Sequence, residues 1–207
     1  MWGCATVPVA SPREVTTAGA PKPSPHARAK VLEAARALVG STRIVVNGKR
    51  YGDDCTGLVR AAYAQAQVNL MTQGLSGDNG VTAIFRFASA HGQVYRGGWP
   101  VPGDLVFFKD TYDVNRDGRI DDGLTHIGIV DDIDATGTVT VIHRVARGVV
   151  RYRMNLALRE LAVGPKGSTV NDYLRSASKG DKPRLTSELF SAYATVLPVE
   201  SGVVGSR

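Results

Sequence analysis

Cys55 is the residue in this sequence best placed for nucleophilic chemistry. It opens a segment, residues 55–67, whose apolar side chains recur at helical spacing. The unpaired N–H groups at a helix N-terminus stabilise a thiolate, so we expect a lowered thiol pKa and donors for a developing oxyanion. Asp54 is expected to cap this helix and Gly57 to permit a close approach. A buried free cysteine on a helix is also a common structural feature, so the motif alone leaves both interpretations open.

Two histidines further along the chain could transfer the protons that a cysteine nucleophile requires. His126 opens the expected strand Thr125–Asp131, and His143 lies in the expected strand Thr138–Arg144, 143 − 126 = 17 residues later. A turn near residues 134–137 would make these strands antiparallel neighbours, so the two side chains could pair on one face of a sheet. Taken singly, a strand histidine is more often only a satisfied structural residue. The order Cys-His-His favours a catalytic interpretation.

The elements that must position these three residues form two groups. Helical periodicity dominates the first half of the chain, and short runs rich in Val, Ile, Phe and Tyr dominate the second half. Helices followed by strands predict an α+β fold. The expected helices are His26–Val39, Cys55–Gln67, Val81–Ala90 and a short one at Thr186–Ala194; the expected strands are Asp104–Phe108, Thr125–Asp131, Thr138–Arg144 and Val149–Asn155.

In its motifs the chain resembles the NlpC and CHAP superfamily of papain-like cell-wall cysteine peptidases and amidases. The resemblance rests on DCTGLV at 54–59, PGDLVFF at 102–108, THIGIV at 125–130 and VIH at 141–143, and covers roughly residues 26–156. It implies a papain-like α+β domain with N-terminal helices packed on a short antiparallel sheet. It also implies that Cys55 is the nucleophile, that His126 is the general base and then acid, and that His143 orients His126.

The oxyanion hole is where the sequence departs from the family pattern. Members of the family often carry a tyrosine a few residues beyond the first helix, and Arg43 occupies the corresponding place here. Tyr51 is a candidate substitute because it is close to Cys55 in sequence. The backbone N–H of Cys55 supplies a further donor, and Asp54 supports the site as a helix cap.

A second motif, at residues 113–124, has the spacing of a calcium-binding loop. Gly118 stands at the sixth position, where such a loop turns sharply, but position twelve is Leu124 rather than Glu. The flanking segments are predicted strands, so a helix–loop–helix hand is not expected. We predict a structural Ca²⁺ that orders the approach to His126, the alternative being an acidic surface loop. The candidate ligands are Asp113, Asn115, Asp117, Arg119 through its carbonyl, Asp121 and Asp122.

The N-terminal segment reads as a tether. Residues 5–25 contain five of the ten prolines and no periodic apolar pattern. The start, Met1-Trp2-Gly3-Cys4-Ala5, resembles the end of a truncated bacterial lipoprotein signal, which would make Cys4 a lipid anchor. An ordinary disordered tail is the alternative. We expect a tether at 1–25, a catalytic domain at 26–197 that carries the calcium loop, and a tail at 198–207.

Composition narrows the partners of the 207-residue chain. A hydrophobic fraction of 43% is typical of a globular protein, and no stretch reaches the roughly 18 apolar residues of a membrane span. The net charge of +6 suits an anionic partner, but scattered Lys and Arg residues without an aromatic platform argue against nucleic acid. We expect a monomer in the cell envelope or periplasm, anchored or secreted, that cleaves amide bonds in peptidoglycan peptide stems. The alternatives are a catalytically silent wall-binding module, and an amide hydrolase or acyltransferase acting on another substrate.

Overall fold

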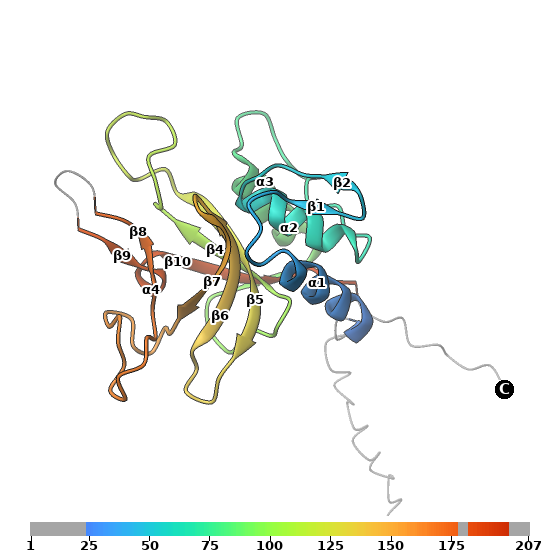
Figure 1. The fold of residues 1–207 in the computed structure, drawn as a ribbon. Helices are drawn as coiled ribbons and strands as arrows, with labels where there is room; N and C mark the ends of the chain where they lie inside the picture. Colours follow the sequence, from blue (N-terminus) through green and yellow to red (C-terminus); the bar gives the residue numbers. More distant parts are fainter. Residues whose placement is uncertain (1–23, 178–181, 199–207) are drawn as a thin grey trace, which may run out of the picture.

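The fold is that of a computed structural model, which describes residues 24–177 and 182–198 (Figure 1). The tether prediction up to residue 23, the lipid-anchor prediction for Cys4 and the tail prediction beyond residue 198 lie outside these residues. None of the helices within the described residues is both long and apolar enough to cross a membrane.

Three helices occupy the first half of the chain, as the periodicity predicts. They are α1 at Pro25–Ala37, α2 at Cys55–Ala64 and α3 at Gly80–His91. A side-chain oxygen caps each N-terminus: Ser24 accepts from the N–H of Ala27, Asp54 caps α2, and Asn79 accepts from two N–H groups of α3. These caps satisfy donors that a helix leaves unpaired at its start, so local sequence fixes where each helix begins.

The second half of the chain builds one six-stranded antiparallel sheet with the order β3-β10-β4-β5-β6-β7. The four strands expected from the sequence are present with small shifts in their ends. Two hairpins, β1 with β2 and β8 with β9, lie outside this sheet. The strands of the sheet are β3 at Gln93–Tyr95, β4 at Leu105–Lys109, β5 at Leu124–Ile133, β6 at Val139–Val145, β7 at Gly148–Met154 and β10 at Phe190–Thr195; the hairpin strands are β1 at Val45–Val46, β2 at Lys49–Arg50, β8 at Tyr173–Arg175 and β9 at Arg184–Leu185.

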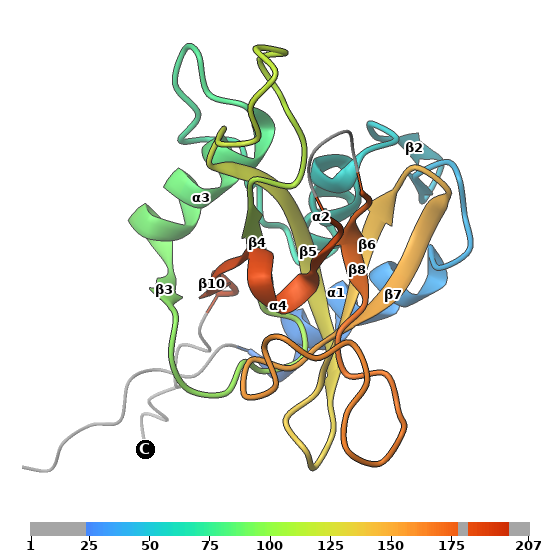
Figure 2. The ribbon, with the colours of Figure 1, turned by 90° about the vertical axis from the view of Figure 1, so that its left-hand side faces the viewer.

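Each face of the sheet packs against its own cluster of apolar side chains. Figures 1 and 2 show α1, α2 and α3 on one side of the sheet, and β8, β9 and the short helix α4 (Thr186–Leu189) on the other. Phe107 and Ile127 belong to the helix-side cluster, whereas Phe108 and Val130 belong to the opposite one. This alternation follows from the two-residue repeat of a strand. The mixed α+β class predicted from the sequence is confirmed.

Asp104, in the PGD segment before β4, joins several elements through one buried carboxylate. Its oxygens accept hydrogen bonds from Arg28 of α1 at 2.9 Å, the Tyr95 hydroxyl of β3 at 2.6 Å and the Thr195 hydroxyl of β10 at 2.9 Å. The backbone N–H of Val101 donates to it at 2.9 Å. A buried carboxylate that is fully paired in this way fixes the relative positions of its partners, because leaving it unpaired would be costly.

The C-terminal segment is the main departure from the sequence prediction. A helix was expected over Thr186–Ala194, but α4 ends at Leu189 and the chain continues as β10. β10 pairs with β3 on one side and β4 on the other. Strands far apart in sequence supply these partners, so the hydrogen bonds that favour the strand are invisible in the local pattern.

Candidate active site

Cys55 is the first residue of α2 and is partly buried. The Asp54 carboxylate caps the helix by accepting from the N–H of Gly57 at 2.7 Å and from the hydroxyl of Thr56 at 2.7 Å. The thiol reaches β5, where the backbone N–H of Ile127 donates to it. The helix start predicted from the sequence therefore brings the thiol to the strand that carries His126.

Gly57 allows the chain to cross the start of α2 closely. A Cβ built on Gly57 would lie 1.8 Å from the carbonyl oxygen of Gly52, a contact that no side chain tolerates. The close approach expected at this glycine is thus made by the loop before the helix. That loop is held further by Asp53, which accepts from the N–H of Ile44 at 2.9 Å and from Arg50 at 2.8 Å.

Cys55 and His126 line the same pocket, with a volume of about 330 Å³. The pocket lies at the end of the sheet where β5 begins and β6 ends, and it includes Leu174 of β8 from the far side of the sheet. Its lining residues are Asp53, Asp54, Cys55, Thr111, Tyr112, His126, Arg144, Val145, Ala146 and Leu174.

His126 and His143 are joined as the strand spacing predicts. The distance between Nε2 of His126 and Nδ1 of His143 is 2.8 Å. Because this bond occupies Nε2, Nδ1 is the nitrogen of His126 that remains for another group. Among the described residues no hydrogen bond joins Cys55 directly to His126.

Burial sets the protonation of all three groups. Burial raises the pKa of the Cys55 thiol to about 11, and the Asp54 carboxylate adds to this shift, whereas donation from Ile127 opposes it. Burial lowers the pKa of His126 to about 4 and that of His143 well below its ordinary value. The prediction of a thiolate at the helix N-terminus is therefore wrong for the resting protein. Near pH 7 these pKa values correspond to a neutral thiol and two neutral imidazoles.

The surroundings of His143 bear on which proton it carries. His143 is fully buried, and its Nε2 has no hydrogen-bond partner within residues 24–177 and 182–198. The rings of Tyr152 and His143 form a T-shaped pair, with ring centroids 4.5 Å apart. If the proton of His143 is on Nε2, its Nδ1 accepts the bond between the two histidines and Nε2 of His126 donates it.

Gly128, two residues beyond His126, makes room for the pair. A Cβ on Gly128 would lie 2.6 Å from Cγ1 of Val141, 2.9 Å from the carbonyl oxygen of Ile142 and 3.1 Å from Cβ of His143. Since Gly128 has no side chain, β6 can pack closely enough for the His143 ring to reach His126.

Tyr112 and Thr111 line the pocket as well, although no sequence pattern pointed to them. Tyr112 is 54% exposed, and its pKa is raised by partial burial and by the nearby Cys55 and Asp54. Thr111 is buried, and its N–H donates to the Thr125 hydroxyl at 2.8 Å, next to His126. Both residues follow β4 directly, so the PGDLVFF motif could have indicated the loop that carries them.

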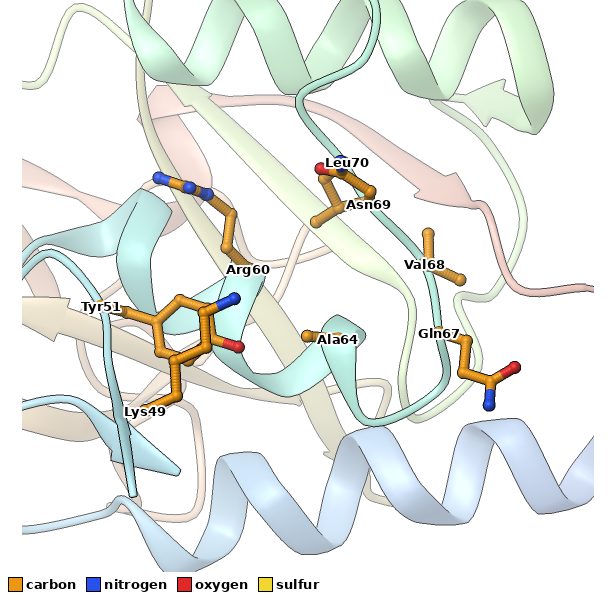
Figure 3. Close-up of a pocket in the computed structure, with 8 residues that line it drawn as sticks. All are labelled: Lys49, Tyr51, Arg60, Ala64, Gln67, Val68, Asn69 and Leu70. Carbon is orange, nitrogen blue, oxygen red and sulfur yellow. The ribbon is translucent and has the colours of Figure 1, made fainter. Parts of the chain in front are cut away.

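Neither proposed side-chain donor to the oxyanion hole lines the Cys55 pocket. Tyr51 lies at a second pocket along α2, shown in Figure 3, where the Lys49 ammonium stands 5.1 Å from the centre of its ring. Arg43 is exposed and makes no hydrogen bond or ion pair with any described residue. The segment before Arg43 is tied to β7 through backbone bonds of Gly40 and Ser41 with Val149, and Arg144, which lines the Cys55 pocket, donates to the carbonyl oxygen of Thr42 at 3.3 Å.

The predicted calcium loop does not form a recognisable cluster of ligands. Within the described residues, no group of three or more His, Cys, Asp or Glu side chains is placed to hold a metal ion. The Asp113 carboxylate accepts from the N–H groups of Arg116 and Gly118, and Asp122 accepts from Val114. These bonds turn the oxygens towards the loop's own backbone. Calcium binding at this loop remains a prediction.

Residues 45–144 match the family model of the CHAP domain. The match assigns this part of the chain, a little under half of its length, to the NlpC/CHAP superfamily. The matched range contains Cys55, His126 and His143, and it ends before β7. The superfamily resemblance drawn from the sequence motifs is therefore confirmed.

Other comparisons give more distant likenesses to the chain that carries this CHAP domain. A Staphylococcus aureus crystal structure, described as similar to a lipoprotein of the NLP/P60 family, is 15% identical with a TM-score of 0.47; the match covers 88% of this chain and 45% of that one. RipD of Mycobacterium tuberculosis, described as a non-catalytic NlpC/p60 domain protein adapted to peptidoglycan binding, is 17% identical with a TM-score of 0.33. That match covers 61% of this chain and 95% of RipD. The chain thus spans less than half of the staphylococcal protein, and no curated protein matches it in sequence.

Proposed function

We propose that this CHAP domain is a cysteine hydrolase that cleaves amide bonds in the peptide stems of peptidoglycan. The observation that carries the proposal is the shared pocket of Cys55 and His126, with His126 held through Nε2 by His143. Membership of the superfamily supports a peptidoglycan-related role, either as a hydrolase or as a binding module.

Proton transfer from Cys55 to Nδ1 of His126 would begin the reaction. A thiol with a pKa of about 11 is a poor nucleophile at pH 7, and an imidazole with a pKa of about 4 is a weak base. We therefore expect the transfer to accompany attack on the substrate carbonyl rather than precede it. The carbon–sulfur bond forms as the thiol proton moves to His126.

His143 would act as a neutral positioning residue. By accepting the Nε2 proton of His126, it holds His126 in the tautomer whose Nδ1 can take a proton. Burial, His126 and Arg147 all lower the pKa of His143, so it contributes a hydrogen bond and no compensating negative charge. The imidazolium of His126 would then be short-lived, stabilised by this bond and by the charge on the substrate.

The remaining steps follow the usual course of acyl transfer. The oxyanion would accept from the backbone N–H of Cys55 at the start of α2, where the helix dipole also favours negative charge. His126 would give its proton to the leaving amine as the C–N bond breaks, which leaves a thioester on Cys55. Water, deprotonated by the same histidine, would attack the thioester and release the acid together with the free thiol.

The principal alternative is a silent binding module, the role described for RipD. A cysteine hydrolase or acyltransferase that acts on a non-wall amide is the second alternative, since the same residues serve any acyl transfer. The intact set of Cys55, His126 and His143 favours catalysis over the binding module. The basic net charge of +6 favours an anionic wall polymer over a neutral substrate.

Release of soluble fragments from purified peptidoglycan tests the proposal directly. Wild type should release fragments whose masses identify the cleaved bond, whereas Cys55→Ala and His126→Gln should lower the rate by at least about a thousandfold. His91→Gln, at an exposed histidine that does not line the Cys55 pocket, is the matched control. Circular dichroism must show that each variant is folded.

A folded wild-type protein that releases no fragment, with or without added calcium, would overturn the hydrolase proposal. Binding to peptidoglycan without cleavage would then favour the silent module. Cleavage that persists in Cys55→Ala would remove Cys55 from its proposed role.

Location and anchoring extend the same proposal. A peptidoglycan substrate places the protein outside the cytoplasm, in the cell envelope or periplasm, or secreted. Lipid attachment at Cys4 and a structural Ca²⁺ in the loop at 113–124 are further parts of the proposal, to be tested by mass spectrometry of the native protein and by ion titration.

A further inference from the structure

Another cavity, distinct from the Cys55 pocket and from the pocket of Figure 3, lies on the face of the sheet opposite α1, α2 and α3. Three cationic side chains line it. It has a volume of about 480 Å³, and no carboxylate is among its lining residues within the described part of the chain. Its floor is apolar and its rim is basic. The lining residues are Arg96, Lys109, Leu156, Arg159, Phe190 and Ser191.

The two arginines are held in place without being neutralised. Nε of Arg96 donates to the carbonyl oxygen of Ser191 at 3.0 Å, and Arg159 donates to the carbonyl oxygen of Glu188 at 3.2 Å. The Glu188 carboxylate itself is engaged elsewhere, by Arg184 at 3.2 Å and by the N–H of Leu185 at 2.7 Å. Because uncharged carbonyls orient both guanidinium groups, each keeps its full charge and its remaining donors.

Lys109 completes the set from the end of β4. Its side chain is exposed and makes no hydrogen bond or ion pair with a described residue. The β4–β5 register shifts between Phe108 and Lys109, and the β10–β4 register shifts between Phe190 and Ala192. Irregularities of this kind redirect side chains from the regular alternation of a strand. They occur where Lys109 and Phe190 meet the same cavity.

Three like charges around an apolar floor cost energy unless an anion joins them. Arginine side chains bind carboxylates and phosphates through paired N–H donors, and oriented guanidinium groups lose little freedom on binding. Leu156 and Phe190 exclude water from one side of the cavity, which strengthens such contacts.

The cavity also lies close to the proposed catalytic pocket. Lys109 is two residues before Thr111, which lines the Cys55 pocket, so their Cα atoms are at most about 7 Å apart. Arg159, Leu156, Phe190 and Ser191 all lie beyond residue 144, outside the segment that matches the CHAP family model. The cavity is thus a feature that the C-terminal segment adds to this CHAP domain.

We propose that this cavity is an exosite for an oxyanion group, carboxylate or phosphate, on the polyanionic envelope polymer that the enzyme cuts. This inference rests on the proposed function, because that function identifies the polymer that carries the bound group. The bound group holds the polymer while a peptide stem enters the Cys55 pocket. The exosite therefore raises affinity for the insoluble polymer and leaves the chemistry at Cys55 unchanged.

Co-sedimentation with insoluble peptidoglycan tests the exosite in a Cys55→Ala background, where cleavage cannot alter the binding surface. One preparation keeps its phosphodiester polymers, one has lost them by treatment with hydrofluoric acid, and one has its stem carboxylates amidated as well. The variant Arg96→Gln/Lys109→Gln/Arg159→Gln should bind about tenfold more weakly than the Cys55→Ala parent. The preparation that loses binding to the parent identifies phosphate or carboxylate as the ligand.

The matched control removes the same charge elsewhere on the surface. Lys30→Gln/Arg60→Gln/Lys166→Gln lowers the net charge equally, through exposed residues outside the cavity, and should stay within about twofold of the parent. Lys109→Gln alone breaks no hydrogen bond of the described structure and should bind about threefold more weakly than the parent. Misfolding would not explain such a loss.

Three outcomes would overturn the exosite: equal binding by the triple variant and its parent, an equal loss in the charge-matched control, or binding of the parent that is insensitive to both polymer treatments. Because binding is measured without the nucleophile, a positive result stands even if the wild type releases no fragments. A negative result, likewise, leaves the cleavage assay unaffected.

Discussion

At the scale of single residues, competition between helix dipole and burial decides the state of Cys55. A helix N-terminus is worth about 0.3–1 kcal/mol to a negative charge, which is less than one pKa unit. Burial in an apolar site shifts pKa values by up to several units. The second effect is larger here, so the thiol has a pKa of about 11 although it begins a capped helix.

Gly128 gives a residue-scale prediction about the histidine pair. Gly128→Ala should lower the rate of fragment release by at least about tenfold and destabilise the fold by about 1–3 kcal/mol, because the added Cβ meets the backbone of β6 next to His143. Chemical denaturation and the peptidoglycan assay measure the two effects. Gly97→Ala is the control, since nothing lies within 4 Å of a Cβ at that position. Unchanged activity in Gly128→Ala would show that the packing of β6 does not position His143.

At the scale of elements, the loop that joins β4 to β5 connects the Cys55 pocket with the predicted calcium motif. Asp110 and Gly123 close this loop through a backbone bond of 2.8 Å. Thr111 and Tyr112, at its start, line the pocket, and Leu124, at its end, begins β5. Ordering of the loop would therefore restrict both Tyr112 and the strand that carries His126.

The calcium prediction belongs to this loop. If Ca²⁺ binds, it should raise the melting temperature by several degrees, and Asp113→Asn/Asp117→Asn should abolish the increase without changing the melting temperature in chelator. Differential scanning fluorimetry with added Ca²⁺ or Mg²⁺ measures the effect. Asp132→Asn/Asp134→Asn, at the end of β5 and at the start of the turn that follows it, controls for charge. Identical melting curves with calcium and with chelator would leave the motif as a self-bonded acidic loop.

At the scale of the whole molecule, the buried neutral histidines couple folding to pH. The pKa of His126 is about 4 in the folded protein and 6.5 in a model peptide. Below pH 6.5 the unfolded chain binds a proton that the folded chain does not, so the free energy of unfolding falls as the pH falls from about 6.5 to about 4.

We expect His126 alone to lower the free energy of unfolding by about 2 kcal/mol between pH 7 and pH 5. This window lies above the pH range in which most carboxylates titrate. Urea unfolding at the two pH values measures the loss, and His126→Gln should reduce it. The same proton lowers activity as the pH approaches 4, because protonated His126 cannot act as a base. An equal pH dependence in wild type and variant would show that His126 is not buried as a neutral group.

The sequence by itself determined the local features of this protein. It predicted three helices from their apolar periodicity, one of them with Asp54 as its cap, four strands from their composition, and the Cys55, His126 and His143 set from motif order. These features depend on neighbours within a few residues or on the regular repeat of a strand, so they can be read along the chain. The hydrogen bond between His126 and His143 followed in the same way from two adjacent strands and a turn.

The features that depend on long-range contacts were decided only by the tertiary structure. β10 is a strand because β3 and β4 offer their backbone groups to it. Tyr51 lines the pocket of Figure 3 and not the Cys55 pocket, although it is only four residues from Cys55 in sequence. The pKa of Cys55 and the basic cavity both depend on groups separated by tens of residues. Burial and the gathering of charge are properties of the folded arrangement, and no local pattern encodes which distant segment will cover a given side chain.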